Sequence, residues 1–425
     1  MLRSLRFTEL SLLLAPCLVL LAGLWLLGIS AGRTVAPTDL RPGFIVIALI
    51  VTSHFVLVVL GVRGDQVIFP VSVMLAGIGF VMVQRLGSSD LAFRQSIWTA
   101  LGFGVLLLTV VLLRDPNVLA RYKYSFAVAG LLLTAVTFVL GSDPNGSGQR
   151  LWIVLGPVQF QPSEILKVLL VVFLAGYLDT YREILVRGRQ RLLGLQLPPI
   201  PYLIPLLIMW VLTLAILVVQ RDLGAALLFF FVFLIMLYIA SAKSYYFWIG
   251  LVAFLIAAYL AYQVVSVFQL RVDIWLDPWR RASAEGYQLV QGLIAFGTGG
   301  VFGEGLGYGS PDVIPAVHTD FVLAAIGEEL GLLGTLGVVL LYIVLVYRGF
   351  RLALTTPDSF RQLLAAGLST VLGLQCLIIL GGTTRLIPLT GITMPFISYG
   401  GSSLLTNFLI IGLLLRLSSP ITAEA

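Results

Sequence analysis

Residues 269–320 read QLRVDIWLDPWRRASAEGYQLVQGLIAFGTGGVFGEGLGYGSPDVIPAVHTD, and this segment decides how the rest of the chain is interpreted. It is rich in Arg, Asp and Glu, whereas long apolar runs precede and follow it. Ionisable groups are costly inside a membrane, so a membrane protein is expected to concentrate its chemistry where charge is tolerated. We therefore predict a scaffold of helices that presents residues 265–320 as a large loop at one membrane face.

The composition identifies the class of protein. The 425 residues are 59% hydrophobic and only 11% charged, with a mean hydropathy of +1.04, whereas soluble domains are about a quarter charged. The apolar runs are continuous rather than alternating, which excludes a transmembrane β-barrel. The net charge of +6 is modest, so membrane lipids are expected partners and nucleic acid is not. Cys17 and Cys376 lie in apolar runs, and no disulfide is predicted.

The apolar runs predict an all-α integral membrane protein, a polytopic helical bundle of about twelve transmembrane helices. Each span needs about 20 apolar residues. The expected spans are 10–29, 44–62, 67–84, 94–113, 123–140, 163–178, 200–219, 222–240, 246–264, 321–347, 362–381 and 397–416.

Lys and Arg residues in the short loops set the expected orientation. With the N-terminus inside, most of the 26 basic residues fall on the cytoplasmic side. They include Arg3, Arg6 and the four arginines of residues 181–191. Both termini are then expected in the cytoplasm, and residues 265–320 face outside.

Two polar stretches at the ends of expected spans each have a structural and a functional interpretation. In QPSEILK (161–167), Glu164 and Lys167 lie one turn apart on one helix face. They either form an ion pair that caps the helix or leave Lys167 to reach a phosphate. In QRDLG (220–224), the charges either mark a tight turn or contribute to a site.

Glu328 and Glu329 lie inside the span that follows Asp320. Adjacent carboxylates are not expected to face one partner together. One of them is therefore expected to face the bundle interior and to pair with Lys167 or an arginine. A structural and a catalytic role are both open for this pair.

Three further features have mainly structural interpretations. GEGLGYG (303–309) lacks the preceding strand and following helix of a phosphate-binding glycine motif, so we expect a flexible outer loop. His54 lies in an apolar run and is interpreted as a packed structural histidine. His318 is expected to cap the next helix, with a catalytic role as the alternative.

The stretch GITMPFISYGGSS (391–403) combines small residues with hydroxyl groups at the start of the last span. Close helix packing alone would explain its glycines. The addition of hydroxyl groups favours the lining of a polar cavity. The residues in question are Ser398, Tyr399, Gly400, Gly401 and Ser402.

Several of these stretches occur together in the SEDS family (shape, elongation, division and sporulation; FtsW/RodA/SpoVE-type), and the chain resembles that family of bacterial membrane peptidoglycan glycosyltransferases. The resemblance covers roughly residues 67–416. It implies a core of about ten spans (66–425) behind a two-helix extension (1–65), in the bacterial cytoplasmic membrane. The matching stretches are QPSEILK (161–167), QRDLG (220–224), WLDP (275–278), GYQLVQGLIAFGTGG (286–300), HTDFVLAAIGEELGLLG (318–334) and LTGITMPFISYGGSS (389–403).

Two positions depart from the family pattern. Arg221 stands where many members have proline. Arg281 stands where members often have a second acid, four residues after the Asp of the LDP motif, so an essential carboxylate at that position would be missing here. We assign the catalytic role to Asp277, because it lies in the LDP motif and its carboxylate begins the loop.

The resemblance implies a substrate, lipid II, which is a disaccharide-pentapeptide on an undecaprenyl pyrophosphate carrier. Polymerising an α-linked sugar pyrophosphate into a β-1,4 glycan inverts the anomeric centre, so Asp277 is expected to deprotonate the incoming 4-hydroxyl. The leaving pyrophosphate needs cations, and a divalent cation, Mg²⁺ or Mn²⁺, is the one cofactor considered. The candidate cations, each with interfacial anchoring as its alternative, are Lys167, Arg271, Arg280 and Arg281. The other expected substrate contacts are Glu164, His318, Asp320, Glu328, Glu329, Ser398, Tyr399, Gly400, Gly401 and Ser402.

The expected protein partner is a class B penicillin-binding protein, a transpeptidase. Two other functions stay open. A carrier that flips lipid II would place charges near the midplane of an alternating path, whereas the acids here crowd the outer half. A non-catalytic scaffold for a cell-wall transpeptidase would not need Asp277. The shared motifs do not distinguish elongation from division or sporulation.

Overall fold

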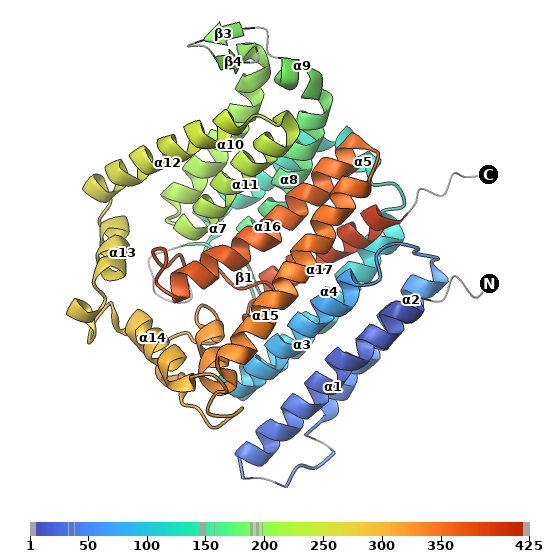
Figure 1. Cartoon of the computed structure of the whole chain (residues 1–425), viewed down its shortest axis with the longest axis vertical. Coiled ribbons are helices and arrows are strands. Elements are labelled where there is room, and N and C mark those ends of the chain that lie inside the picture. Colours follow the sequence, from blue (N-terminus) through green and yellow to red (C-terminus); the bar gives the residue numbers. More distant parts are fainter. Residues whose placement is uncertain are drawn as a thin grey trace. The chain divides into compact units, whose positions relative to one another are not determined.

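The computed structural model describes residues 6–32, 34–37, 39–143, 150–156, 158–187, 190–192, 195–197 and 199–419, and these are mostly helical (Figure 1). The helices are α1 (Phe7–Ser30), α2 (Arg41–Val59), α3 (Ile68–Leu86), α4 (Ser89–Leu112), α5 (Asn117–Arg121), α6 (Lys123–Ala135), α7 (Thr137–Leu140), α8 (Pro162–Thr180), α9 (Arg182–Arg187), α10 (Ile200–Val219), α11 (Leu223–Ser241), α12 (Ser244–Val264), α13 (Ser266–Leu276), α14 (Tyr287–Gly299), α15 (Val322–Thr355), α16 (Ser359–Thr383) and α17 (Gly401–Ser418). Two 3-10 turns are η2 (Trp279–Arg281) and η3 (Pro311–Val313). Two antiparallel hairpins pair β1 (Ile153–Leu155) with β2 (Val158–Phe160) and β3 (Gln190–Leu192) with β4 (Leu195–Leu197).

Eleven helices in the described part of the chain are long and apolar enough to cross a membrane. They correspond to all the expected spans but one. The remaining expected span, 163–178, forms the helix α8. That helix has 19 residues but carries Glu164, Lys167 and Asp179, so its charges set it apart from the others. The segment 265–320 is more ordered than a simple loop, because it contains α13 and α14.

The chain packs as two compact units. Unit 1 comprises Met1–Arg114, Val265–Arg348 and Gln375–Ala425, and unit 2 comprises Asp115–Val264 and Gly349–Leu374. Arg3 and Arg189, which were counted in the expected orientation, lie outside the described residues.

The centre of unit 1 is the contact between α4 and α17. Phe103 on α4 and Phe408 on α17 are almost completely buried, with ring centroids 4.9 Å apart. A Cβ atom on Gly102 would come within 2.3 Å of the Phe408 ring. The absence of a side chain at this glycine therefore permits the close approach of the two helices.

The first two helices join unit 1 through a buried charged cluster. Arg6 donates from Nε to the Glu9 carboxylate (2.9 Å) and from Nη1 to the Val62 carbonyl (2.8 Å). His54 Nδ1 lies 2.7 Å from the other Glu9 oxygen. His54 is thus a structural histidine, as expected, and Arg6 binds an internal acid rather than lying free at the membrane surface.

Unit 2 is organised around α8, which packs against α6 and α11. Tyr177 of α8 is buried and donates to the Tyr202 carbonyl (2.9 Å). The stretch 220–224 forms a turn in which Arg221 has a φ of 61°. Asp222 then caps α11 by accepting a hydrogen bond from the Ala225 amide (3.1 Å).

Candidate active site

Asp277 lies at the end of α13, where the chain turns into η2. Pro278 follows, and proline disfavours a helical conformation in the residue before it, so α13 ends here. The Asp277 amide donates to the Asp273 carbonyl (3.0 Å), and Asp277 Oδ1 accepts from the Arg280 amide (3.3 Å). The side chain is exposed. The backbone around the carboxylate is therefore fixed, while its oxygens stay accessible to a ligand.

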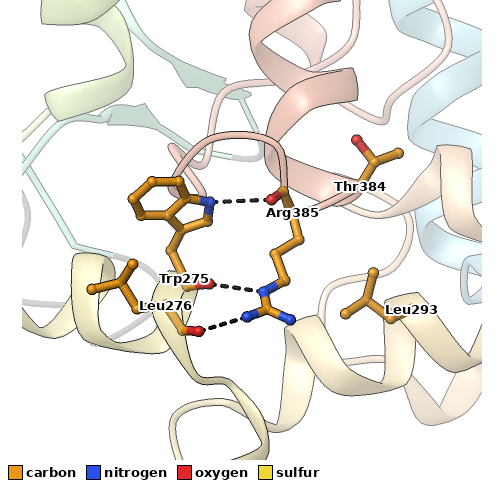
Figure 2. Close-up of a pocket in the computed structure, with 5 residues that line it drawn as sticks. All are labelled: Trp275, Leu276, Leu293, Thr384 and Arg385. Atoms are coloured by element: carbon orange, nitrogen blue, oxygen red, sulfur yellow. Dashed lines mark hydrogen bonds between the residues drawn. The ribbon is translucent and has the colours of Figure 1, made fainter.

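Arg385, which follows α16, holds this turn in place. It donates from Nε to the Trp275 carbonyl (2.9 Å) and from Nη2 to the Leu276 carbonyl (2.5 Å), as Figure 2 shows. The Trp275 indole donates in return to the Arg385 carbonyl (3.1 Å). The last carbonyls of a helix lack intrahelical partners. Arg385 therefore satisfies two of them directly before Asp277.

An open cavity of about 410 Å³ lies at the same place. Trp275, Leu276 and Leu293 form its apolar walls, and Thr384 and Arg385 supply its polar groups (Figure 2). Asp277 is the next residue after Leu276, so an exposed carboxylate begins directly beyond the cavity wall.

Arg271 and Asp320 lie near the loop that precedes α17. Arg271 donates from Nη1 to the Thr390 carbonyl (3.1 Å) and so braces this loop. A Cβ atom on Gly391 would lie 3.8 Å from Asp320 Oδ2. Burial raises the pKa of Asp320 to about 6. A hydrogen bond from Thr319 and the positive charge of Arg271 act in the opposite direction but are smaller effects.

The residues before α15 are bonded to the same loop. The Tyr399 amide donates to the His318 carbonyl (2.8 Å), and their rings lie 5.8 Å apart. Ser398 Oγ donates to the Thr319 carbonyl (2.5 Å) and accepts from the Met394 amide (2.9 Å). Burial lowers the pKa of His318. Its ring makes no hydrogen bond to α15 in the described chain, so the expected capping role is wrong, since the ring packs against Tyr399 instead.

The small residues at the start of α17 are packing positions. A Cβ atom on Gly401 would lie only 2.1 Å from the Trp98 indole. Gly400 is buried, Ser402 is 1% exposed and Ser398 is 3% exposed. Gly400, Gly401, Ser398 and Ser402 are buried, whereas Tyr399 is half-buried, so the lining of a polar cavity stays a prediction. The packing interpretation accounts for the glycines.

Glu328 and Glu329 are both buried, and both accept hydrogen bonds from residues 303–310, which we call the glycine cradle. The Ser310 amide donates to Glu328 Oε1 (2.7 Å), and the Gly307 amide donates to Glu329 Oε2 (3.0 Å). The two adjacent carboxylates thus bind different residues, as expected. Both meet the cradle because its backbone offers several amides. The cradle makes several backbone hydrogen bonds to α15, whereas the sequence predicted a flexible outer loop.

The arginine that pairs with Glu329 is Arg85, in the last turn of α3. It donates from Nε to Glu329 Oε1 (2.9 Å), from Nη1 to Asp312 (3.1 Å) and from Nη2 to the Gly309 carbonyl (3.0 Å). The expected pairing with an arginine is therefore confirmed. One guanidinium links α3, α15 and the glycine cradle.

Arg280 and Arg281 are exposed on η2, in the same turn as Asp277. Arg281 Nη1 lies 3.6 Å from Glu285 Oε2, and both side chains are about half exposed. Such a surface pair contributes only about 0–1 kcal/mol. Arg280 and Arg281 are thus accessible to a ligand at small energetic cost.

Glu164 and Lys167 belong to unit 2, unlike the residues above. Lys167 Nζ lies 2.6 Å from Glu164 Oε2, and both residues are buried. Beside them, Ser163 Oγ donates to Asp222 Oδ2 (3.3 Å). The helix-capping ion pair is therefore formed as one of the two expected alternatives.

The described residues contain no group of three or more His, Cys, Asp or Glu side chains placed to hold a metal ion. Sequence analysis missed two cations that organise the site, Arg85 and Arg385. Arg85 looks like an interfacial anchor, and its partners lie more than 220 positions away. Arg385 carries one signal, a charge inside an otherwise uncharged stretch before the 389–403 motif.

The fold and the ordered polar segment define a multi-pass helical membrane protein with an exposed carboxylate among arginines. A protein-family model described as "Cell cycle protein", that of FtsW, RodA and SpoVE, matches residues 65–422. The chain belongs to this family, and the resemblance seen in its motifs is confirmed.

Named relatives agree with this assignment. Peptidoglycan glycosyltransferase RodA of Mycobacterium tuberculosis is 40% identical over 426 residues, covering 97% of this chain and 90% of that protein. The probable peptidoglycan glycosyltransferase FtsW of Geobacter sulfurreducens is 35% identical over 371 residues, covering 84% and 95%.

Solved structures share the fold. The Rod shape determining protein RodA of Thermus thermophilus is 28% identical with a TM-score of 0.60, covering 84% of this chain and 96% of that chain. A chain from a solved structure described as "Structural coordination of polymerization and crosslinking by a peptidoglycan synthase complex" is 30% identical with a TM-score of 0.70, covering 84% and 97%.

Proposed function

We propose that this peptidoglycan glycosyltransferase polymerises lipid II into β-1,4 glycan strands on the outer face of the cytoplasmic membrane, with Asp277 as the general base. The observation that carries the proposal is the exposed Asp277 carboxylate, held by backbone contacts next to a cavity that contains a guanidinium. The relatives' names, peptidoglycan glycosyltransferase, support the reaction class.

The reaction is a displacement at the anomeric carbon of the donor sugar. The 4-hydroxyl oxygen of the acceptor forms the new bond to that carbon, and the bond from carbon to pyrophosphate oxygen breaks. Asp277 takes the hydroxyl proton, and a base in reach of the nucleophile supplies roughly 10²–10⁴ in rate. The pyrophosphate leaves with the bonding electron pair and needs no proton if cations meet its charge.

The cations nearest Asp277 in the chain support this step. Arg280 and Arg281 are exposed on the following turn. Arg271 braces the loop before α17. Lys167 is buried and paired with Glu164. Its proposed role as a cation for the pyrophosphate is therefore secondary to that of the loop arginines.

A divalent cation bound to the pyrophosphate is part of the family expectation. The described residues offer no cluster of three ligands for it, so no step of this mechanism passes through a metal. The expected protein partner is a class B penicillin-binding protein. The similar chain from a peptidoglycan synthase complex, in which polymerisation is coordinated with crosslinking, supports this partner.

The orientation, with both termini cytoplasmic, is also a proposal. It follows from the loop charges. In a cysteine-free background, Ser310→Cys should react with an impermeant thiol reagent in whole cells, and Arg351→Cys should not. The reverse labelling pattern would overturn the orientation. The two-helix extension, residues 1–65, is proposed to be peripheral to the chemistry.

The decisive experiment replaces Asp277 and measures glycan polymerisation from purified lipid II. Asp277→Asn should lower the rate by roughly 10²–10⁴ and leave expression and lipid II binding close to wild type. Glu285→Gln is the matched control, an exposed acid of the same segment; an equal loss there would transfer the role to Glu285. Wild-type glycan chains from Asp277→Asn would favour a lipid II carrier or a scaffold for a transpeptidase.

A further inference from the structure

We propose that the cavity between the end of α13 and the loop after α16 binds the pyrophosphate of the lipid-linked donor, with Arg385 as its principal cation. This inference rests on the proposed function and deepens it. Arg385 lies outside the sequence motifs, and the cavity it lines lies next to Asp277, the proposed base.

The first observation is the uncompensated charge of Arg385. A guanidinium has five N–H donors, and Arg385 uses Nε and Nη2 on two backbone carbonyls. No carboxylate in the described residues lies within salt-bridge distance of it. Carbonyl oxygens are neutral, so they orient the guanidinium without cancelling its charge. The remaining donors are available to an anionic ligand.

The second observation is the backbone of Arg385, which has a φ of 61°. Glycine adopts this conformation freely, whereas a residue with a side chain is strained there. Strain of this kind persists where the surrounding structure enforces it and is concentrated at functional sites. The chain places an arginine here although glycine would fit the backbone better.

The third observation is the surroundings of the guanidinium. Trp275, Leu276 and Leu293 form apolar walls, and none of the residues that line the cavity is acidic. The carbonyl end of α13 carries partial negative charge and would repel a phosphate. Arg385 binds two of its carbonyls, and a full positive charge exceeds the partial charge of about −0.5 at a helix C-terminus.

The position relative to Asp277 fits the reaction. Arg385 binds the carbonyl of Leu276, the residue directly before the base. A pyrophosphate on the guanidinium would therefore place the donor's anomeric bond within reach of the acceptor that Asp277 deprotonates. Two other arginines of the region have protein partners: Arg271 binds the Thr390 carbonyl, and Arg281 lies by Glu285.

The test measures binding to the purified full chain in detergent micelles, separately from activity. The probes are undecaprenyl pyrophosphate and undecaprenol, which differ only in the pyrophosphate group. Arg385→Gly removes the guanidinium and suits the backbone, so this variant is expected to fold. Arg385→Gln and Arg385→Lys complete the series, and the exposed Arg351→Gln is the matched control.

We expect the wild-type chain to prefer the pyrophosphate over the alcohol. Arg385→Gly and Arg385→Gln should weaken pyrophosphate binding about 10- to 100-fold, the range of a charge-assisted hydrogen bond, and leave undecaprenol binding unchanged. Arg385→Lys should retain part of the preference, and Arg351→Gln all of it.

Two results would overturn the assignment. One is wild-type preference for the pyrophosphate in Arg385→Gly. The other is an equal loss for both probes, which would indicate that Arg385 only shapes the fold. Asp277→Asn should keep the full preference, so failure of the base assignment and failure of this subsite give different results.

Discussion

Replacing Arg85 with alanine should destabilise the folded protein strongly. Glu329 is fully buried and Arg85 is 16% exposed, with a separation of 2.9 Å. Removing one partner of a buried ion pair typically costs about 3–5 kcal/mol, because the other charge stays buried without compensation. The second carboxylate on Arg85, that of Asp312, is 59% exposed, so that pair contributes only about 0–1 kcal/mol.

The assay is thermal unfolding of the purified protein in detergent. The fall in melting temperature for Arg85→Ala should be at least about three times that for Asp312→Ala, in line with the two energy ranges. The double replacement Arg85→Met with Glu329→Gln should recover much of the loss, because no charge is then left buried. Equal melting of Arg85→Ala and wild type would refute this account, as would a double variant no more stable than the single one.

Two further predictions concern Asp320, before α15, and Gly401, at the start of α17. Asp320→Asn should raise the melting temperature at pH 7.5 and change it little near pH 4. The pKa of Asp320 is raised to about 6 in the folded protein. The protonated carboxyl therefore contributes stability that is fully present below about pH 4 and is lost as the pH rises through 6. An equal gain in melting temperature at both pH values would contradict this. Gly401→Ala should lower the free energy of unfolding by about 1–3 kcal/mol, because the added methyl group overpacks against Trp98. Gly337 has open space around it, so Gly337→Ala should be tolerated. Equal melting temperatures for the two variants would argue against the packing role of Gly401.

The sequence predicted the helices well, because each span is a long apolar run bounded by charges or glycine. The helix α8 forms where it was expected, although it carries more charges than the other spans. Glu164 and Lys167 are buried within the protein and pair with each other. Their spacing of one turn had already offered this ion pair as one of two alternatives.

The site was predicted only in part. The motif placed Asp277 at the start of a polar segment, and the structure shows that segment to be ordered. The cradle around Glu328 and Glu329 was missed, since it depends on backbone amides that no side-chain pattern reveals. Arg85 and Arg385 were missed because the partners of each are more than 100 positions away. Such contacts follow from the packing of helices, not from local spacing.

The glycine cradle also bears on how this segment tolerates sequence drift. Gly303, Gly305 and Gly307 have φ values of 84°, 103° and 83°, which suit glycine alone. The residues between them carry side chains, and Tyr308, beyond the last of the three, is 66% exposed. Because the buried glutamates are bound through amides, the exposed positions 304 and 308 can vary without removing these hydrogen bonds. Randomising these two positions should yield many folded clones, so the loop can acquire new surface contacts while its anchor stays unchanged.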